Sequence, residues 1–130
     1  EFWCLGSQYW ARHPHVQGYN ARFGILLDMV GGEGSVFMKE GYSEDFAPDI
    51  NKKVWKAAKK LGYGKTFMDG NGGLVTDDHL FIKTIDIIPT SPDGDFTPTW
   101  HTVNDTMDHI DKNTLKAVGQ TVLEVIYNEK

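Results

Sequence analysis

Residues 22–32, RFGILLDMVGG, contain an apolar run from Phe23 to Leu27 that ends at Asp28 and is closed by a pair of glycines. The run is too short for a helix. An unbroken apolar segment of this length is typical of a strand that is buried on both faces. We therefore predict a buried strand over 23–27, with Asp28 at its carboxyl end.

Three further segments have clear patterns. Residues 84–88, TIDII, predict a second buried strand. Residues 43–64 predict an amphipathic helix that Gly62 stops, with apolar positions at three- and four-residue spacing: Phe46, Ile50, Val54, Ala57, Ala58 and Leu61. After Asp111, a predicted N-cap, a last helix has the expected core stripe Leu115, Val118, Val122, Val125 and Ile126.

The segments between these elements are irregular. MDGNGGLV, residues 68–75, has the composition of a turn, and SPDGDFTPT, residues 91–99, predicts a loop broken by prolines. Strands that alternate with helices predict an α/β fold in which helices sandwich a sheet.

Composition limits the class of protein. The chain has 130 residues, a net charge of −5 and 40% hydrophobic residues, which suits one globular domain. Its 18 acidic residues outnumber 13 basic ones, and its basic cluster, NKKVWKAAKK at 51–60, falls on the solvent face of a predicted helix, which argues against nucleic-acid binding. Cys4 is the single cysteine, so no internal disulfide is expected, and no apolar run is long enough to span a membrane.

Polar residues follow the apolar runs at three places: Asp28, TDDH at 76–79 and WHT at 100–102. Ligand sites of α/β sheets collect outside the carboxyl ends of the strands. Acids and histidines that meet there predict a metal site or an acid–base site.

Each candidate also has a simpler interpretation. Asp28 can be a turn residue, and Asp77 or Asp78 can cap a short helix from Leu80 in which His79 packs against a neighbour. His101 can be an ordinary polar residue, as we expect for His13, His15 and His109. The glycine-rich stretches VGGEG and DGNGG lack the lysine of a phosphate-binding loop.

The first residues, EFWCLGSQYWARHPHVQGY, begin with large aromatic side chains and no signal for the start of a helix or strand. We expect an element to precede them, and therefore expect this chain to be part of a larger domain that does not fold or act alone.

The motifs LGSQYWA, FGILLDMVGG, VTDDHLFI, IDIIP, WHTVNDTMDHID and NTLKAVGQTVLEVIYNE occur in an order that resembles the C-terminal half of the M28 zinc-exopeptidase family. Within that family the resemblance is strongest to bacterial glutaminyl cyclases. It implies a mixed β-sheet sandwiched by helices, of which residues 1–130 form a part. It also implies one zinc ion in the cyclases or two in the aminopeptidases.

The resemblance also implies roles for single residues. His101 resembles the histidine ligand of zinc, and Trp100 the indole that lines the substrate pocket, with Thr76 and Trp3 as further candidates for substrate contacts. Asp28 resembles an aspartate that binds a second zinc in aminopeptidases and joins a buried hydrogen-bond network in cyclases. Asp77 resembles the other network member, where aminopeptidases usually have serine, and one of these two acids is expected to hold a proton.

The implied reaction converts an N-terminal glutamine of a peptide or protein to pyroglutamate with loss of ammonia, in the periplasm or outside the cell. The other zinc ligands, an Asp and a Glu, and the glutamate that moves the proton belong to the half of the family's fold that precedes LGSQYWA. The family also has a few more residues where Ile82 joins Lys83 in this chain. An M28 aminopeptidase and a non-catalytic interaction fragment remain as alternatives.

Overall fold

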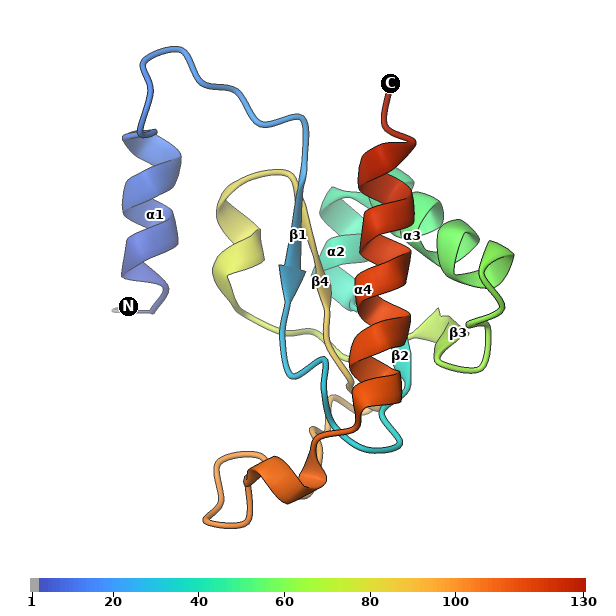
Figure 1. The fold of residues 1–130 in the computed structure, drawn as a ribbon. Coiled ribbons are helices and arrows are strands. Elements are labelled where there is room, and N and C mark those ends of the chain that lie inside the picture. Colours follow the sequence, from blue (N-terminus) through green and yellow to red (C-terminus); the bar gives the residue numbers. More distant parts are fainter. Residues whose placement is uncertain (1–2) are drawn as a thin grey trace.

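The computed structural model describes residues 3–130. Its helices are α1 (Leu5–Arg12), α2 (Gly41–Phe46), α3 (Pro48–Lys60) and α4 (Lys112–Tyr127), with two 3₁₀ turns, η1 (Asp78–Phe81) and η2 (Met107–His109). Its strands are β1 (Gly24–Leu27), β2 (Phe37–Lys39), β3 (Phe67–Asn71) and β4 (Thr84–Ile87). Helices flank the strands, with α4 in front and α1 to one side (Figure 1), so the α/β class is confirmed.

Strands β1 and β4 are the two buried strands that the apolar runs predict. They pair in parallel from Gly24 opposite Thr84 to Leu27 opposite Ile87. Ile85 and Ile87 of β4 are fully buried in the core against α3 and α4. Because the strands are parallel, their carboxyl ends meet at the same edge, where Asp28 and Ile88 follow.

Strands β2 and β3 form a second parallel pair, which the sequence did not predict. The segment 68–71 was expected to be a turn, and this prediction is wrong. Only Phe67 of β3 is buried, while its other four residues are exposed, so the strand lacks the alternation that marks a half-buried strand. In the described residues the strands form two parallel pairs, and outside these strands an isolated antiparallel bridge joins Gly32 to Ile110.

The helix predicted over 43–64 is two helices that meet at Ala47. Pro48 occupies the first turn of α3, and a proline inside a continuous helix would remove a backbone hydrogen bond and clash with the preceding turn. Phe46 therefore ends α2 with 59% of its surface exposed, and Leu61 is also partly exposed, so neither belongs to the core stripe. The remaining predicted apolar positions are buried, together with Trp55 and Asn51.

Helix α4 begins as predicted, because the Asp111 carboxylate accepts hydrogen bonds from the backbone N–H groups of Asn113 and Thr114. Its buried face is rotated from the predicted stripe, however, and consists of Thr114, Ala117, Val118, Thr121 and Val125. Leu115 and Ile126, which were expected in the core, are exposed. Ala117 and Thr121 are small residues of this buried face, and α4 packs against α3.

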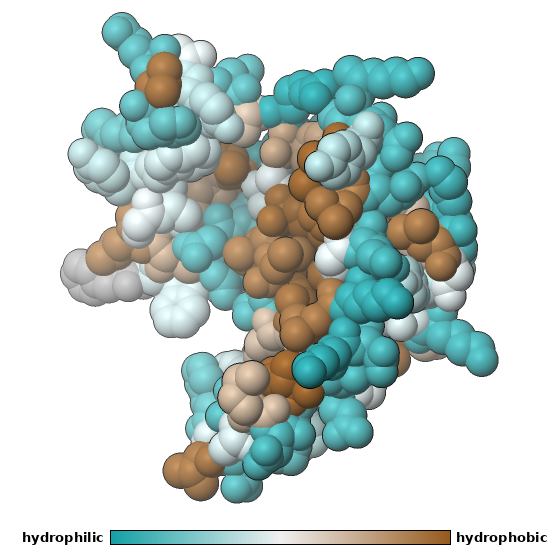
Figure 2. All heavy atoms as spheres, in the orientation of Figure 1, coloured by the Kyte–Doolittle hydropathy of each residue, from teal (hydrophilic) through white to brown (hydrophobic). Residues whose placement is uncertain are grey.

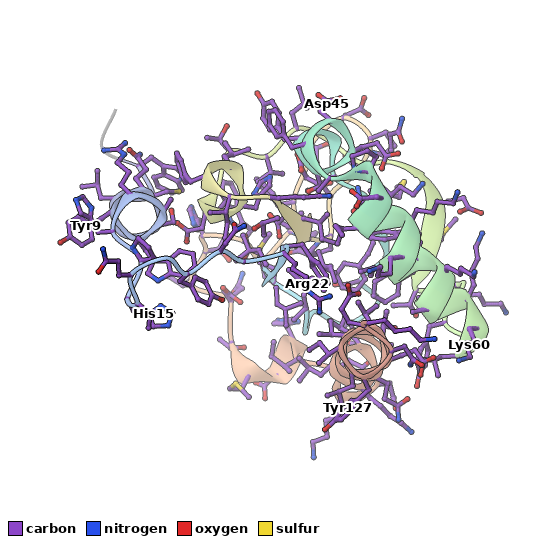
Figure 3. The ribbon with its side chains drawn as sticks, turned by 90° about the horizontal axis from the view of Figure 1, so that it is seen from above. Tyr9, His15, Arg22, Asp45, Lys60 and Tyr127 are labelled. Atoms are coloured by element: carbon purple, nitrogen blue, oxygen red, sulfur yellow. The ribbon has the colours of Figure 1, made fainter. Side chains whose placement is uncertain are left out.

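Helix α1 starts without a side-chain cap, since Cys4 precedes it in a left-handed conformation. The helix is instead tied to η1, where Ser7 Oγ donates a hydrogen bond of 2.7 Å to Asp78 Oδ1. Tyr9 and His15 lie on the outer side of this part of the chain (Figure 3). His13, His15 and His109 are exposed, as expected. No helix among residues 3–130 is long and apolar enough to cross a membrane.

Candidate active site

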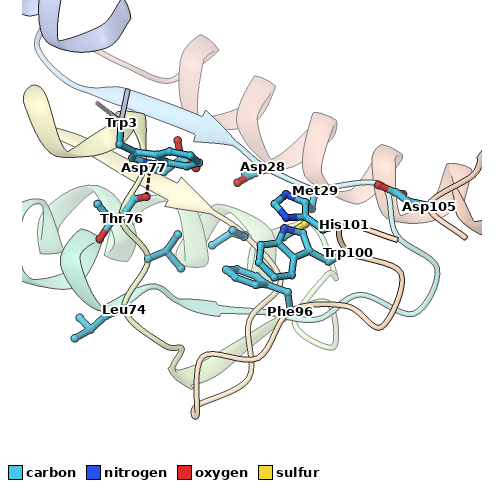
Figure 4. Close-up of a pocket in the computed structure, with 12 residues that line it drawn as sticks. Trp3, Asp28, Met29, Leu74, Thr76, Asp77, Phe96, Trp100, His101 and Asp105 are labelled. Atoms are coloured by element: carbon cyan, nitrogen blue, oxygen red, sulfur yellow. Dashed lines mark hydrogen bonds between the residues drawn. The ribbon is translucent and has the colours of Figure 1, made fainter. Parts of the chain in front are cut away.

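A pocket of about 560 Å³ opens at the carboxyl ends of β1 and β4. All six candidate site residues line it: Trp3, Asp28, Thr76, Asp77, Trp100 and His101. Figure 4 shows Trp3, Thr76 and Asp77 on one side, the aromatic side chains of Phe96 and Trp100 with His101 on the other, and Asp28 between them. The structure therefore brings together the three polar segments that the sequence places after apolar runs.

The Trp100–His101 pair is stacked. The two ring centroids lie 4.0 Å apart with an angle of 18° between the planes, and Phe96 packs against the far side of this pair at 4.5 Å from the Trp100 ring. Trp100 is 41% exposed and lines the pocket. His101 adopts a left-handed backbone conformation, with φ of 56°.

Left-handed backbone is concentrated around the pocket. Cys4, Met29 and His101 are the residues other than glycine with positive φ among residues 3–130. Met29 and His101 line the pocket, and Cys4 lies next to Trp3, with its thiol 3.8 Å from Asp77 Oδ1. Such conformations cost about 1–3 kcal/mol each and cluster at functional sites.

Asp28 and Asp77 approach the pocket from different elements. Asp28 follows β1 and extends the ladder with a backbone hydrogen bond to Ile87 O of 3.1 Å. Burial raises the pKa of Asp28, and the nearby charge of Asp77 raises it further. Asp77 caps η1, with Oδ1 accepting from Asp78 N at 2.6 Å, so the capping interpretation is confirmed, although the turn starts at Asp78 and not at Leu80. Asp77 thus has a local role and also lines the pocket.

The described residues supply only part of a zinc site. His101 is exposed on the pocket wall, and an exposed imidazole nitrogen is a suitable zinc ligand. Within residues 3–130, the one group of three metal-binding side chains that lie close together is Cys4, Asp77 and Asp78, which does not include His101. Because catalytic zinc sites use three protein ligands, His101 fits such a site as one ligand of a set that this chain does not complete.

A buried polar cluster behind the pocket, formed by Glu40, His79 and Asp86, was not predicted from the sequence. All three side chains are fully buried, with His79 Nε2 at 3.2 Å from Glu40 Oε2 and His79 Nδ1 at 3.8 Å from Asp86 Oδ2. The pKa of Asp86 is raised to about 8, mainly by burial and further by the nearby charges of Asp28, Asp77 and Glu40. The expectation that His79 packs against a neighbour is confirmed. The sequence feature that could have indicated this cluster is Asp86 itself, a carboxylate within the apolar run TIDII.

The loop at 91–99 reaches the pocket because it packs closely on the glycine-rich turn. A Cβ atom on Gly73 would lie 2.3 Å from Gly94 Cα, so a side chain larger than hydrogen would separate the two segments. This contact places Leu74 and Phe96 in the pocket wall. Neither residue was predicted, because the approach joins two turns that are distant in sequence.

Comparisons with known proteins agree with this geometry. The family model of peptidase family M28 matches residues 1–126. The chain is 80% identical to Bacteroides thetaiotaomicron glutaminyl cyclase bound to N-acetylhistamine, with a TM-score of 0.94 over 98% of this chain and 46% of that chain. It is 79% identical to a leucine aminopeptidase precursor from Bacteroides thetaiotaomicron VPI-5482, with a TM-score of 0.93 over 98% and 45% of the two chains.

A Zn-dependent exopeptidase from Parabacteroides distasonis ATCC 8503 is 52% identical, with a TM-score of 0.92 over 98% of this chain and 46% of that chain. The chain thus spans about half the length of the structures that it matches. No curated protein matches it.

Proposed function

The chain belongs to peptidase family M28, and we propose that it is part of a zinc-dependent glutaminyl-peptide cyclotransferase, which converts an N-terminal glutamine to pyroglutamate with release of ammonia. The proposal rests on one observation: the stacked Trp100–His101 pair, Asp28 and Asp77 line the same pocket. The high identity to a glutaminyl cyclase supports it.

His101 would hold zinc together with ligands from outside this chain. The chemistry that a zinc ion supplies when bound is Lewis-acid polarisation of the carbonyl of the glutamine side-chain amide. The exposed face of Trp100 offers an apolar wall against which the glutamine side chain packs, so that the α-amine of the peptide and the amide carbon are held within reach of each other. The new bond forms between these two atoms, and the side-chain nitrogen leaves as ammonia.

The acids of the pocket would hold protons during this exchange. Since the pKa of Asp28 is raised, Asp28 can retain a proton beside Asp77 at a pH at which an exposed aspartate is ionised. A pair of acids with one proton can donate to and accept from a third carboxyl group that carries the proton from amine to ammonia. That third group is the glutamate that the family resemblance places outside this chain.

The test of this proposal needs the complete enzyme, meaning a protein in which this chain is joined to the part of the fold that the related structures contain and this chain does not span. We expect the complete enzyme to release ammonia from a Gln-initiated peptide, with a pyroglutamyl product, and to leave a Leu-initiated chromogenic amide intact. Ammonia and free amine are measured in parallel. Cleavage of the leucine amide with an inert Gln peptide would overturn the proposal.

A metal-dependent aminopeptidase is the second candidate, favoured by the 79% identity to a leucine aminopeptidase precursor. In that case Asp28 becomes a ligand of a second zinc ion, and the complete enzyme binds two zinc ions per molecule. Metal analysis of the purified enzyme separates the two functions, because the cyclase requires one.

Asp77→Asn gives a further prediction for the cyclase. We expect the variant to keep its fold and its zinc and to lose roughly 10- to 100-fold in turnover, because Asp77 acts on the reacting groups through hydrogen bonds and does not touch the metal. Asparagine still accepts the hydrogen bond from Asp78 N, so the cap of η1 is retained. Turnover and zinc content are measured on the same sample, and loss of zinc in this variant would contradict the prediction.

Trp100→Ala is the matched variant on the other wall of the pocket. An indole contributes apolar contact and no ligand atom. We therefore expect a KM for the Gln peptide that is about 10-fold higher, with zinc retained. An unchanged KM would mean that Trp100 does not contact the substrate.

A further inference from the structure

Glu40 carries an unusually complete set of hydrogen bonds for a buried acid. It immediately precedes α2, and its carboxylate accepts from Tyr42 N at 2.9 Å, from Ser43 N at 2.7 Å and from Ser43 Oγ at 2.7 Å. The two bonds from backbone N–H groups cap α2, and the bond from the Ser43 hydroxyl adds to them. Glu40 has two further hydrogen bonds, and the partners in these bonds lie outside α2.

The remaining two bonds join Glu40 to the pocket wall. Glu40 Oε1 accepts from Val75 N at 2.9 Å, and Oε2 lies 3.2 Å from His79 Nε2. Val75 and His79 stand at the two ends of a short segment whose middle residues, Thr76 and Asp77, line the pocket. A single fixed carboxylate thus holds both ends of the segment that presents Asp77.

The direction of the bond to His79 follows from the charge of Glu40. Burial alone would raise the pKa of Glu40, but hydrogen bonds from His79, Val75 and Ser43 outweigh it and lower the pKa to about 2. An ionised carboxylate only accepts hydrogen bonds, so His79 Nε2 must be the donor. In a neutral imidazole this leaves Nδ1 without a proton.

Asp86 is consistent with this arrangement. His79 Nδ1 and both oxygens of Asp86 are buried without a hydrogen-bond partner in the described part of the chain, and the nearest pair, Nδ1 and Oδ2, is 3.8 Å apart. The raised pKa of Asp86 keeps a proton on that carboxyl group near neutral pH. No second anion therefore faces Nδ1, and nothing there favours a proton on that nitrogen.

We propose that Glu40 is a positioning residue of the pocket: it holds Val75 and His79 at the two ends of the segment that presents Thr76 and Asp77, and it keeps the His79 proton on Nε2. The effect on turnover rests on the proposed cyclase function, whereas the hydrogen-bond arrangement does not.

Glu40→Gln in the complete enzyme tests the proposal. A glutamine side chain has the same shape but replaces one acceptor oxygen by an NH₂ donor. If the NH₂ group takes the Oε2 position, it faces Ser43 N–H and His79 Nε2, and the bond to His79 is kept only when the His79 proton moves to Nδ1. If it takes the Oε1 position it faces Val75 N–H, which loses its acceptor. The variant therefore either changes the tautomer of His79 or removes the acceptor of Val75 N–H.

Two measurements follow these outcomes. ¹⁵N chemical shifts of the His79 ring report the tautomer, and hydrogen exchange reports the protection of Val75 N–H. We expect the Nε2–H tautomer and a protected Val75 in the wild type, and a change in one of the two in Glu40→Gln. Turnover of the Gln peptide should fall roughly 10- to 100-fold, with kcat affected more than KM. Glu44→Gln is the control, because Glu44 lies in α2, the helix that Glu40 precedes, and accepts a hydrogen bond from Asn51. This variant should change none of the measured quantities.

The wild-type tautomer decides the question even if Glu40→Gln does not fold. A proton on Nδ1 of His79 in the wild type would overturn the proposal, and so would a folded Glu40→Gln variant in which the tautomer and the Val75 protection are both unchanged. These measurements stay informative if the enzyme proves to be an aminopeptidase, since they do not depend on the substrate.

Discussion

His101→Ala is expected to remove zinc and activity together from the complete enzyme. A catalytic zinc ion is held by three protein ligands, and two ligands bind it too weakly to survive purification. Without the metal, the polarisation of the amide carbonyl is lost as well, so turnover should fall by at least about 1000-fold. Zinc content and turnover are measured on the same preparation. A full complement of zinc in the variant would show that His101 is only a neighbour of the site.

The left-handed backbone at His101 calls for a second variant. Alanine is poorly suited to a φ of 56°, so His101→Ala could distort the loop as well as delete a ligand. Asparagine adopts this conformation more readily than most residues. His101→Asn should therefore keep the loop and the packing of Trp100 yet lose zinc, while His13→Ala, at an exposed histidine that stacks on Tyr9, should retain both zinc and turnover.

The parts of this site that the sequence predicts are those set by strand direction. Asp28 follows one apolar run, and parallel pairing of β1 with β4 brings the residues after both runs to one edge. The same reasoning could not find Glu40, because nothing local in FMKEGY distinguishes a buried carboxylate from an exposed one. Its burial depends on bonds to Val75 and His79, which lie 35 and 39 residues further along the chain.

The errors in the fold have a similar origin. The apolar spacing across Ala47 is continuous, but Pro48 starts a new helix and turns Phe46 toward solvent. Strand β3 has the composition of a turn and is a strand because its backbone pairs with β2. In both places the structure follows from backbone hydrogen bonding, which the pattern of apolar side chains does not reveal.

The chain of residues 1–130 by itself is expected to be inactive and to be aggregated or only partly folded. Within the described residues, β1 pairs with β4 on one side and has no strand on the other. Figure 2 shows an apolar band over β1 and the adjoining side of α4. Large apolar side chains of these two elements are exposed: Leu27 at 46%, Leu115 at 42%, Leu123 at 52% and Ile126 at 56%. An open strand edge beside exposed apolar surface favours association between copies.

Size-exclusion chromatography and thermal unfolding of the isolated chain, compared with the complete enzyme, check this expectation. Leu27→Lys makes the comparison sharper. On the isolated chain a lysine at this exposed edge should reduce aggregation. In the complete enzyme, where we expect further structure to cover β1, the same change should lower the free energy of unfolding by at least about 2 kcal/mol, because a buried leucine is lost and a charge takes its place.

Opposite effects of Leu27→Lys in the two proteins would identify the band over β1 as the surface on which the rest of the fold packs. This result would also explain why the described residues supply only part of a zinc site. The carboxyl end of β1 places Asp28 in the pocket, so structure that covers β1 reaches the same edge as His101 and can supply the other ligands. A monodisperse isolated chain that unfolds cooperatively and turns over the Gln peptide would contradict this account, because His101 would then hold zinc with ligands supplied by this chain alone.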